Sequence, residues 1–193
     1  IYTVLEGPQE LYFGHETQVN INIVETVHIP IDGGQLEKCY ISPTKRRGVE
    51  RRSLVWAPVQ SAQVLLGDKL GCGIPHTCAQ PTCPICAVYG GLITKDTEVE
   101  EGVPGYPKRK ATTTNGRLVH GGGVAVQPHD VVEKQRAMHP SMLHKEPGKE
   151  PTPTPFRRQY NEPGLLYPAY NHCLSVTEAE FSAVAYAFLD AMP

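Results

Sequence analysis

The sequence lacks the features that would place it in a membrane or mark it as a generally basic protein. No apolar run reaches the roughly 18 residues that a membrane span requires, and no secretory signal is visible. Acidic and basic side chains nearly cancel over the 193 residues, which leaves a formal net charge of -2. Any nucleic-acid surface must therefore be local. We expect a cytoplasmic protein without a membrane partner.

Signatures of catalysis are missing as well. The chain contains no Gly-x-Ser-x-Gly elbow and no glycine-rich loop of the kind that cradles a phosphate, and its histidines are scattered. Aromatic residues make up only 7% of the chain. Trp56 is the single tryptophan, and we expect it in the core. The sequence therefore gives no support to a hydrolase triad.

The apolar residues, 40% of the chain, suffice for one core, and 18 glycines and 18 prolines divide the chain into many short elements. We expect a single domain over residues 1–193. β-branched residues alternate over residues 16–31 and predict a strand. Asp32 and Gly33 then predict a tight turn into a second strand over residues 37–41.

Two helices are predicted. A short amphipathic helix is expected over residues 59–66, directly after a proline that forces a boundary. A longer helix over 175–192 begins with a capping box at Ser175 or Thr177. Helical spacing predicts that its core-facing stripe consists of Phe181, Val184, Ala185, Phe188, Leu189 and Met192. Two further segments are expected, a glycine-interrupted strand over 117–127 and a charged, Pro-rich loop over about 145–156.

Four of the six cysteines are crowded into a short insert over about residues 70–91. A disulfide is disfavoured without a sign of secretion. A redox role is also disfavoured, because the Cys-x-x-Cys pair follows a polar loop and not a buried strand. Closely spaced thiolates suit tetrahedral zinc, and four of them leave no open position for catalysis. We expect a structural zinc site on Cys72, Cys78, Cys83 and Cys86, with His76 as an alternative to Cys72.

Basic residues gather in a few places although the chain as a whole is not basic. The densest group is Lys45, Arg46, Arg47, Arg51 and Arg52. A solvated loop would show the same composition, but such local density favours contacts with nucleic-acid phosphates. Tyr160 follows two arginines and can stack on a base. The further candidates for nucleic-acid contact are Thr17, Gln18, Lys108, Arg109, Lys110, Arg157, Arg158 and Tyr160.

The string CPICAVYGG, at residues 83–91, resembles a segment of the CRISPR-associated "Cas seven" backbone subunits of the RAMP superfamily. HETQVNINIVETVHIP and TKRRGVERRS are similar to the early strand region and the basic segment of the type I-D subunits, with type IV the nearest competitor. The resemblance covers about residues 14–91 and weakens from residue 117 onward. It points to type I-D as the subtype.

This resemblance implies an α+β fold, a modified RRM-like (ferredoxin-like) palm with inserted loops. It implies a non-catalytic subunit of a class 1 effector for antiviral defence. Copies of the subunit would form a filament along a CRISPR RNA guide, each gripping the guide backbone and wedging a hairpin thumb between bases. Target nucleic acid and other effector subunits would be further partners, and zinc the cofactor.

Two alternatives stay open. In the first, the chain is a type III-like backbone subunit that cleaves target RNA through a loop aspartate, for which Asp32 is the candidate. In the second, it is a zinc-stapled interaction module outside CRISPR biology, whose basic loops dock on a protein. Cleavage of guide-complementary RNA would favour the first alternative. Absence of nucleic acid from the purified protein would favour the second.

Overall fold

The computed structural model describes residues 1–12, 16–18, 21–59, 63–96, 110–128, 131–138 and 154–192. The chain forms two compact units and passes between them repeatedly. Unit 1 contains residue 1 with residues 43–121 and 171–193, and unit 2 contains residues 2–42 and 122–170. The expected α+β class is confirmed, because small β-sheets and four helices are present in the described residues. A single domain with two inserts stays a prediction.

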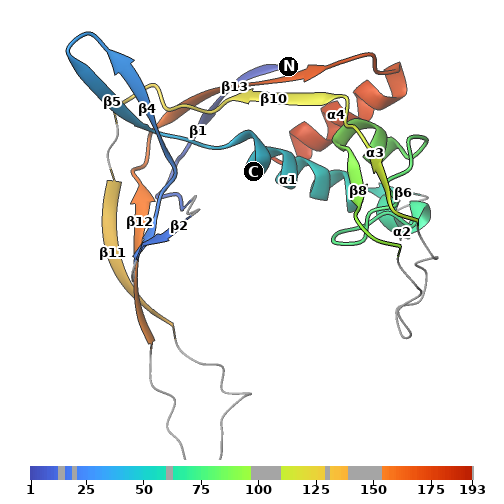
Figure 1. Cartoon of the computed structure of the whole chain (residues 1–193), viewed down its shortest axis with the longest axis horizontal. Helices are drawn as coiled ribbons and strands as arrows, with labels where there is room; N and C mark the ends of the chain where they lie inside the picture. Colours follow the sequence, from blue (N-terminus) through green and yellow to red (C-terminus); the bar gives the residue numbers. More distant parts are fainter. Residues whose placement is uncertain are drawn as a thin grey trace, which may run out of the picture. The chain divides into compact units, whose positions relative to one another are not determined.

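Unit 1 is built around its two longest helices, α1 (Pro43–Val55) and α4 (Glu178–Asp190), which pack against each other. The short helix α3 (Pro84–Tyr89) contacts both, and α2 (Leu66–Leu70) contacts α1 (Figure 1). No helix in the described part of the chain is long and apolar enough to cross a membrane. The core between the helices includes Leu54, Val55, Ile85, Val88, Leu118, Val184 and Ala187.

The start of unit 1 differs from the sequence-based expectation. The basic stretch lies within helix α1, which begins at Pro43, a residue well suited to the first helical position. The helix predicted over residues 59–66 is wrong. Strands β6 (Pro58–Val59) and β7 (Val64–Leu65) pair there in antiparallel fashion, and α2 begins only after them. Proline is compatible with the first residue of such a short strand, because its missing N–H need not pair there.

Helix α4 confirms the predicted capping box but not the predicted stripe. The Thr177 hydroxyl accepts a hydrogen bond from the Glu180 N–H, and the Glu180 carboxylate accepts one from the Thr177 N–H. Val184 and Ala187 are the buried residues, whereas Leu189 is 68% exposed. Val184 was therefore placed correctly, whereas Ala187 replaces the larger Phe181 and Leu189 on the buried face. Trp56, expected in the core, is 58% exposed.

Two further sheets contain strands of unit 1. Strands β8 (Gly91–Ile93) and β9 (Thr112–Thr114) pair in antiparallel fashion. A separate three-stranded sheet has the order β1-β13-β10. Its members are β1 (Tyr2–Glu6), β13 (Leu166–Cys173) and β10 (Leu118–Gly122). The strand predicted over 117–127 is thus confirmed in its first half. The chain passes from one unit to the other within β10 and within β13.

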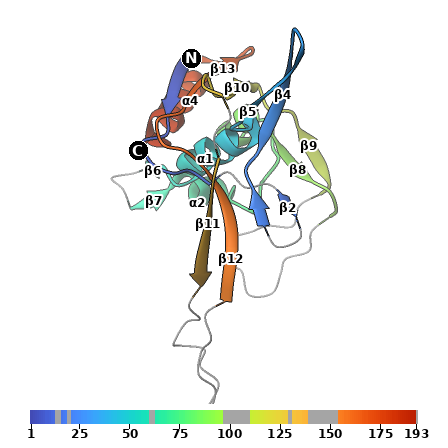
Figure 2. The ribbon, with the colours of Figure 1, turned by 90° about the vertical axis from the view of Figure 1, so that its left-hand side faces the viewer.

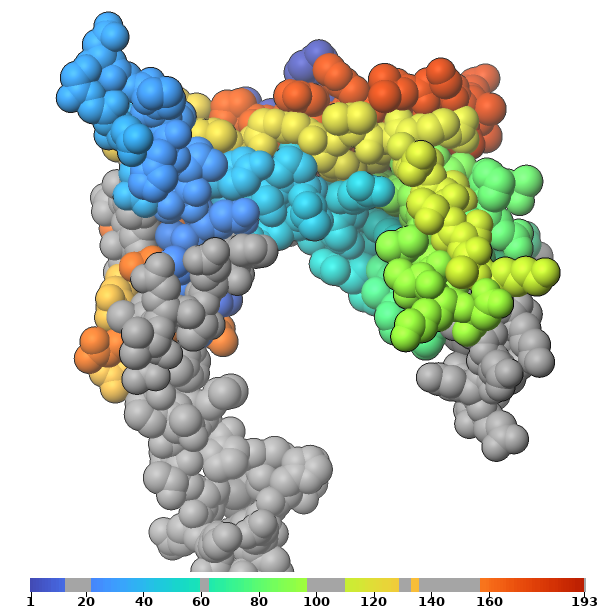
Figure 3. All heavy atoms as spheres, in the orientation of Figure 1, coloured from blue at the N-terminus to red at the C-terminus, as the bar shows by residue number. Residues whose placement is uncertain are grey.

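Unit 2 contains the hairpin that Asp32 and Gly33 predicted. Strands β4 (Thr26–Ile31) and β5 (Gly34–Cys39) pair in antiparallel register, and the two residues form the turn between them. Gly33 has a positive φ of 89°, which glycine adopts without steric cost. The side chains at the tip of the hairpin are exposed (Figure 3). The core beneath consists of Cys39, Ile41, Ala125, Leu165 and Tyr167.

The second sheet of unit 2 has the order β11-β12-β3-β2. Strands β11 (Val131–Met138) and β12 (Thr154–Asn161) form a long antiparallel pair (Figure 2). β12 pairs in parallel with β3 (Ile21–Ile23), and β3 pairs with β2 (Glu16–Gln18). The single strand predicted over residues 16–31 is therefore wrong. The chain forms β2, β3 and β4 there, and β2 and β3 are antiparallel neighbours.

Candidate metal centre and basic surfaces

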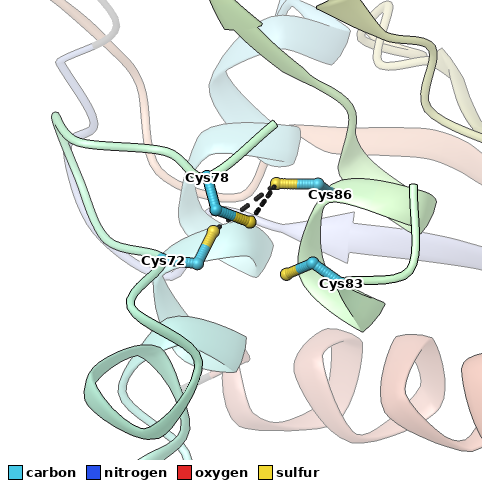
Figure 4. A group of neighbouring side chains, drawn as sticks. All are labelled: Cys72, Cys78, Cys83 and Cys86. Atoms are coloured by element: carbon cyan, nitrogen blue, oxygen red, sulfur yellow. Dashed lines mark hydrogen bonds between the residues drawn. The ribbon is translucent and has the colours of Figure 1, made fainter. Parts of the chain in front are cut away.

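The four predicted cysteine ligands come together in unit 1. Their sulfur atoms all lie within 4.8 Å of one another, and the group could hold a metal ion. Cys72 and Cys78 belong to the loop before α3, Cys83 is the N-cap residue of α3, and Cys86 lies in its first turn (Figure 4). The Cys86 sulfur is 3.5 Å from that of Cys72 and 3.6 Å from that of Cys78. The spacing of the sequence thus predicted that these four cysteines come together, and their binding of zinc stays a prediction.

Local backbone features shape this loop. Helix α2 ends at Gly71, whose left-handed conformation (φ 57°) turns the chain toward the site. The Cys72 N–H donates to the Gly67 carbonyl, which fixes the first ligand against α2. Pro84 occupies the first position of α3 and favours a helix start there. Cys83 and Cys86 consequently lie one helical turn apart on the same side.

The donor set fits a divalent metal. Burial raises the pKa of the Cys78 thiol to about 11, and hydrogen bonds from Cys83 and Cys86 lower the pKa of Cys72. A bound cation would offset the charge of several thiolates held this closely, and metal affinity couples to their deprotonation. His76 is exposed and does not belong to the group, so Cys72 completes the set.

The basic residues of α1 have different environments. Arg46 is buried and donates to the Gly121 carbonyl at 2.6 Å. Burial lowers the pKa of Arg47, and the charge of the nearby Arg51 lowers it further. Arg51 donates to the Thr77 hydroxyl at 3.0 Å. Arg52 is exposed, and Lys45 is half-buried. The proposed phosphate contacts of all five cations remain predictions, and Arg46 and Arg51 donate hydrogen bonds within unit 1.

A buried polar cluster that sequence analysis missed surrounds Glu50 of α1. Its carboxylate lies 2.8 Å from His120 Nε2, accepts from the Asn171 side-chain amide at 3.0 Å, and accepts from the Tyr89 hydroxyl at 3.5 Å. Burial, and then the Glu50 charge, raises the pKa of Tyr89, so its phenol remains a donor. One signal was available: Arg46, Glu50 and Leu54 recur every four residues, as one helix face does.

In unit 2, two of the residues predicted to contact nucleic acid, Arg158 and Tyr160, lie on β12. Arg158 lies opposite Lys134 on one side and opposite Asn22 on the other. Its guanidinium carbon is 4.7 Å from the centre of the Tyr12 ring. The Tyr12 and Tyr160 rings are tilted, with centroids 6.1 Å apart. We refer to Tyr12, Arg158 and Tyr160 as the tyrosine–arginine cluster. Tyr12 could not be predicted, because it lies far in the sequence from β12, which carries Arg158 and Tyr160.

The remaining candidates are spread over both units. Arg157 is exposed and lies 3.6 Å from the Glu133 carboxylate. Thr17 pairs with Asn22 and Gln18 with Ile21 by backbone register in β2 and β3. Lys110 is exposed, whereas Lys108, Arg109 and most of the Pro-rich loop over 145–156 lie outside the described residues. Asp32, the candidate for RNA cleavage, is an exposed turn residue.

Comparisons with known proteins support the fold. No family model matches the sequence, and no curated protein matches it. One chain of a solved structure titled "Type IV-B CRISPR Complex" has a similar fold, with a TM-score of 0.51 and 14% sequence identity. The match covers 97% of this chain and 79% of that chain. At this identity the likeness shows the fold alone, and it does not support the type I-D assignment.

Proposed function

We propose that this protein is a CRISPR RNA-binding backbone subunit of a class 1 effector, related to type IV. The observation that supports this proposal best is the likeness of fold to a chain of a CRISPR complex, which extends over 97% of the protein. Copies of the subunit assemble along the guide, contact other effector subunits and present the guide to target nucleic acid. The subunit itself performs no chemical step, and its role belongs to antiviral defence.

Each unit offers its own contacts to the guide. In unit 2, the tyrosine–arginine cluster combines a cation for phosphate with aromatic rings on which bases stack. In unit 1, Arg52 is exposed on α1, one turn before the exposed Trp56. Contacts of this kind read the backbone and the base faces, not the base edges. They suit a protein that must accept any guide sequence.

The four-cysteine group holds zinc in this proposal. The metal links the loop before α3 to the first turn of α3, and a four-thiolate site contributes to folding and not to catalysis. Cys86→Ser should reduce the zinc content of the purified protein from about one per chain to nearly none. Cys173→Ser, a change outside the group, is the matched control. Equal zinc contents in the two variants would contradict the site.

The direct test is purification of the protein together with its RNA. We expect oligomers that contain bound RNA, and we expect the double variant Arg158→Glu, Tyr160→Ala to lose most of that RNA while it remains folded. Lys69→Glu, an exposed charge reversal on α2, is the control. A wild-type protein that remains monomeric with RNA at low salt would contradict the proposal. Absence of nucleic acid would favour the protein-docking alternative.

The proposal that the subunit does not cleave RNA requires a separate test. Asp32 lies in a tight turn, where aspartate is common for conformational reasons. We therefore expect that the wild type and Asp32→Ala leave guide-complementary RNA equally intact, as followed by gel electrophoresis. Cleavage by the wild type that disappears in Asp32→Ala would instead establish the type III-like alternative.

A further inference from the structure

The hydroxyl of Thr77 has a defined hydrogen-bond direction. It accepts from Arg51 Nη2 at 3.0 Å and from the Ala79 N–H at 3.3 Å. A threonine hydroxyl has two acceptor lone pairs and a single proton. With both lone pairs engaged, the proton is left for the two sulfur contacts of this hydroxyl, Cys86 at 3.1 Å and Cys72 at 3.8 Å, and the shorter contact, with Cys86, is the better hydrogen bond. Thr77 is therefore the donor and the sulfur the acceptor, as expected for a metal-bound thiolate.

The charge of Arg51 also needs a partner on this side of α1. Its Nε is buried without a hydrogen-bond partner, and no carboxylate among the described residues forms an ion pair with it. Arg47 lies near enough for the two positive charges to repel each other. Zinc with four thiolates carries a net charge of about −2. Such a centre would offset the positive charge of Arg51, which contacts Thr77 beside the Cys86 sulfur.

The position of Thr77 is tightly enclosed. A Cβ atom on Gly91 would lie 2.9 Å from the Thr77 hydroxyl oxygen and 2.8 Å from Ala79 Cα. Glycine at this position therefore lets the loop approach β8 with the hydroxyl still directed at the sulfur. Ala79 itself has a positive φ of 48°, which an alanine rarely adopts. The close approach of Gly91 and the positive φ of Ala79 therefore both occur next to the Thr77 hydroxyl.

We propose that Thr77 and Arg51 are the supporting residues of the four-cysteine metal centre. Thr77 donates a hydrogen bond to the Cys86 thiolate, and Arg51 orients the Thr77 hydroxyl and offsets part of the negative charge of the centre. This inference rests on the zinc site of the proposed function. It gives Arg51 a role that differs from the phosphate contact predicted from the sequence.

The experiment compares metal affinities by competition with a chelator, using zinc and, separately, cobalt(II). Thr77→Val keeps the shape of the side chain and removes the hydroxyl, so we expect a 10- to 100-fold loss of metal affinity. The thiolate-to-cobalt absorption bands should move to longer wavelength, because the sulfur has lost a hydrogen bond. Thr77→Ser should restore both values. Thr113→Val, an exposed change on β9, is the control.

The metal affinity of Arg51→Gln is a second measurement, which can be made whether or not Thr77→Val folds. We expect weaker metal binding by Arg51→Gln and an unchanged RNA affinity of its zinc-loaded form. Wild-type metal affinity in both Thr77→Val and Arg51→Gln would overturn this inference but not the proposed zinc site. Reduced RNA affinity of Arg51→Gln with unchanged metal affinity would overturn the role of Arg51. A wild-type protein that binds no metal would overturn the zinc site as well.

Discussion

At the scale of single residues, Glu50 shows how one buried carboxylate can join several elements. It lies in α1, and its partners come from α3, β10 and β13. His120 contacts it through Nε2, while Nδ1 is buried without a partner. Because a carboxylate only accepts hydrogen bonds, His120 Nε2 is the donor in this contact. Glu50 therefore serves as the common acceptor of three donors.

Removal of this acceptor should be costly. Glu50→Ala leaves three buried donors without their partner, and we expect the free energy of unfolding to fall by about 3 kcal/mol. Glu50→Gln keeps one carbonyl acceptor and should lose less. Asp190→Ala, a change of an exposed acid at the end of α4, should stay within about 0.5 kcal/mol of the wild type. Urea unfolding measures all three, and equal stabilities of Glu50→Ala and Asp190→Ala would contradict the role of Glu50.

Tyr167 predicts a loss of stability at alkaline pH. Burial raises its pKa from 10.0 to about 12. The folded state then holds the phenol proton more tightly than the unfolded state does. This contribution is fully present below pH 10, and up to about 2 kcal/mol is lost as the pH rises through 12.

The test compares the wild type with Tyr167→Phe by urea unfolding at several pH values. At pH 8 the variant should be less stable by about 1 kcal/mol, because the Asn161 side-chain amide loses the Tyr167 oxygen that it contacts at 2.9 Å. Near pH 12 the order should reverse, since the variant has no phenol to ionise. A constant difference across this range would contradict the assignment.

At the scale of elements, helix α1 explains why part of the sequence analysis failed. A pattern of apolar residues normally identifies the buried face of a helix, but two of the four buried residues of α1 are Arg46 and Glu50. Their burial depends on a carbonyl of Gly121 and on side chains from other elements. These partners lie far away in the sequence, so composition alone suggested one exposed basic segment.

The two faces of α1 should respond differently to charge reversal. Arg46→Glu places a second carboxylate in a buried site without a partner, and we expect a loss of several kcal/mol in stability. Arg52→Glu changes an exposed side chain, so stability should change by less than about 0.5 kcal/mol while RNA affinity falls. Thermal melts and RNA titrations separate the two effects. Equal stabilities of the two variants would contradict the burial of Arg46.

Elements with local signals were predicted well from the sequence. Asp32 and Gly33 specify their turn through backbone conformation, and Thr177 specifies the start of α4 through a bond to Glu180 only three residues away. The four cysteines of the candidate metal centre also lie within one short segment. By contrast, β3 pairs with the distant strand β12 as well as with β2. The alternating local pattern is the same for one long strand and for two short antiparallel strands, so it could not predict the reversal between β2 and β3.

At the scale of the whole molecule, charge must act locally, because the net charge is only -2. We expect RNA affinity to fall steeply with salt, since release of counterions from each contacted phosphate contributes about 0.7 to the logarithmic slope for a single strand. Arg158→Glu should reduce that slope by about one such contribution or more, whereas Lys69→Glu should leave it unchanged. Filter binding from 50 to 300 mM salt measures both slopes. A salt-independent affinity would contradict phosphate contacts.

The chain passes between the two units after residues 1, 42, 121 and 170, so neither unit is a continuous segment. On the ribosome, every residue of unit 2 has been synthesised once residue 170 is added, while unit 1 still lacks α4. The apolar faces of α1 and α3 must wait for Val184 and Ala187 to cover them. At typical rates of synthesis this delay lasts about one to four seconds. During that interval, the nascent chain presents a surface that suits a chaperone.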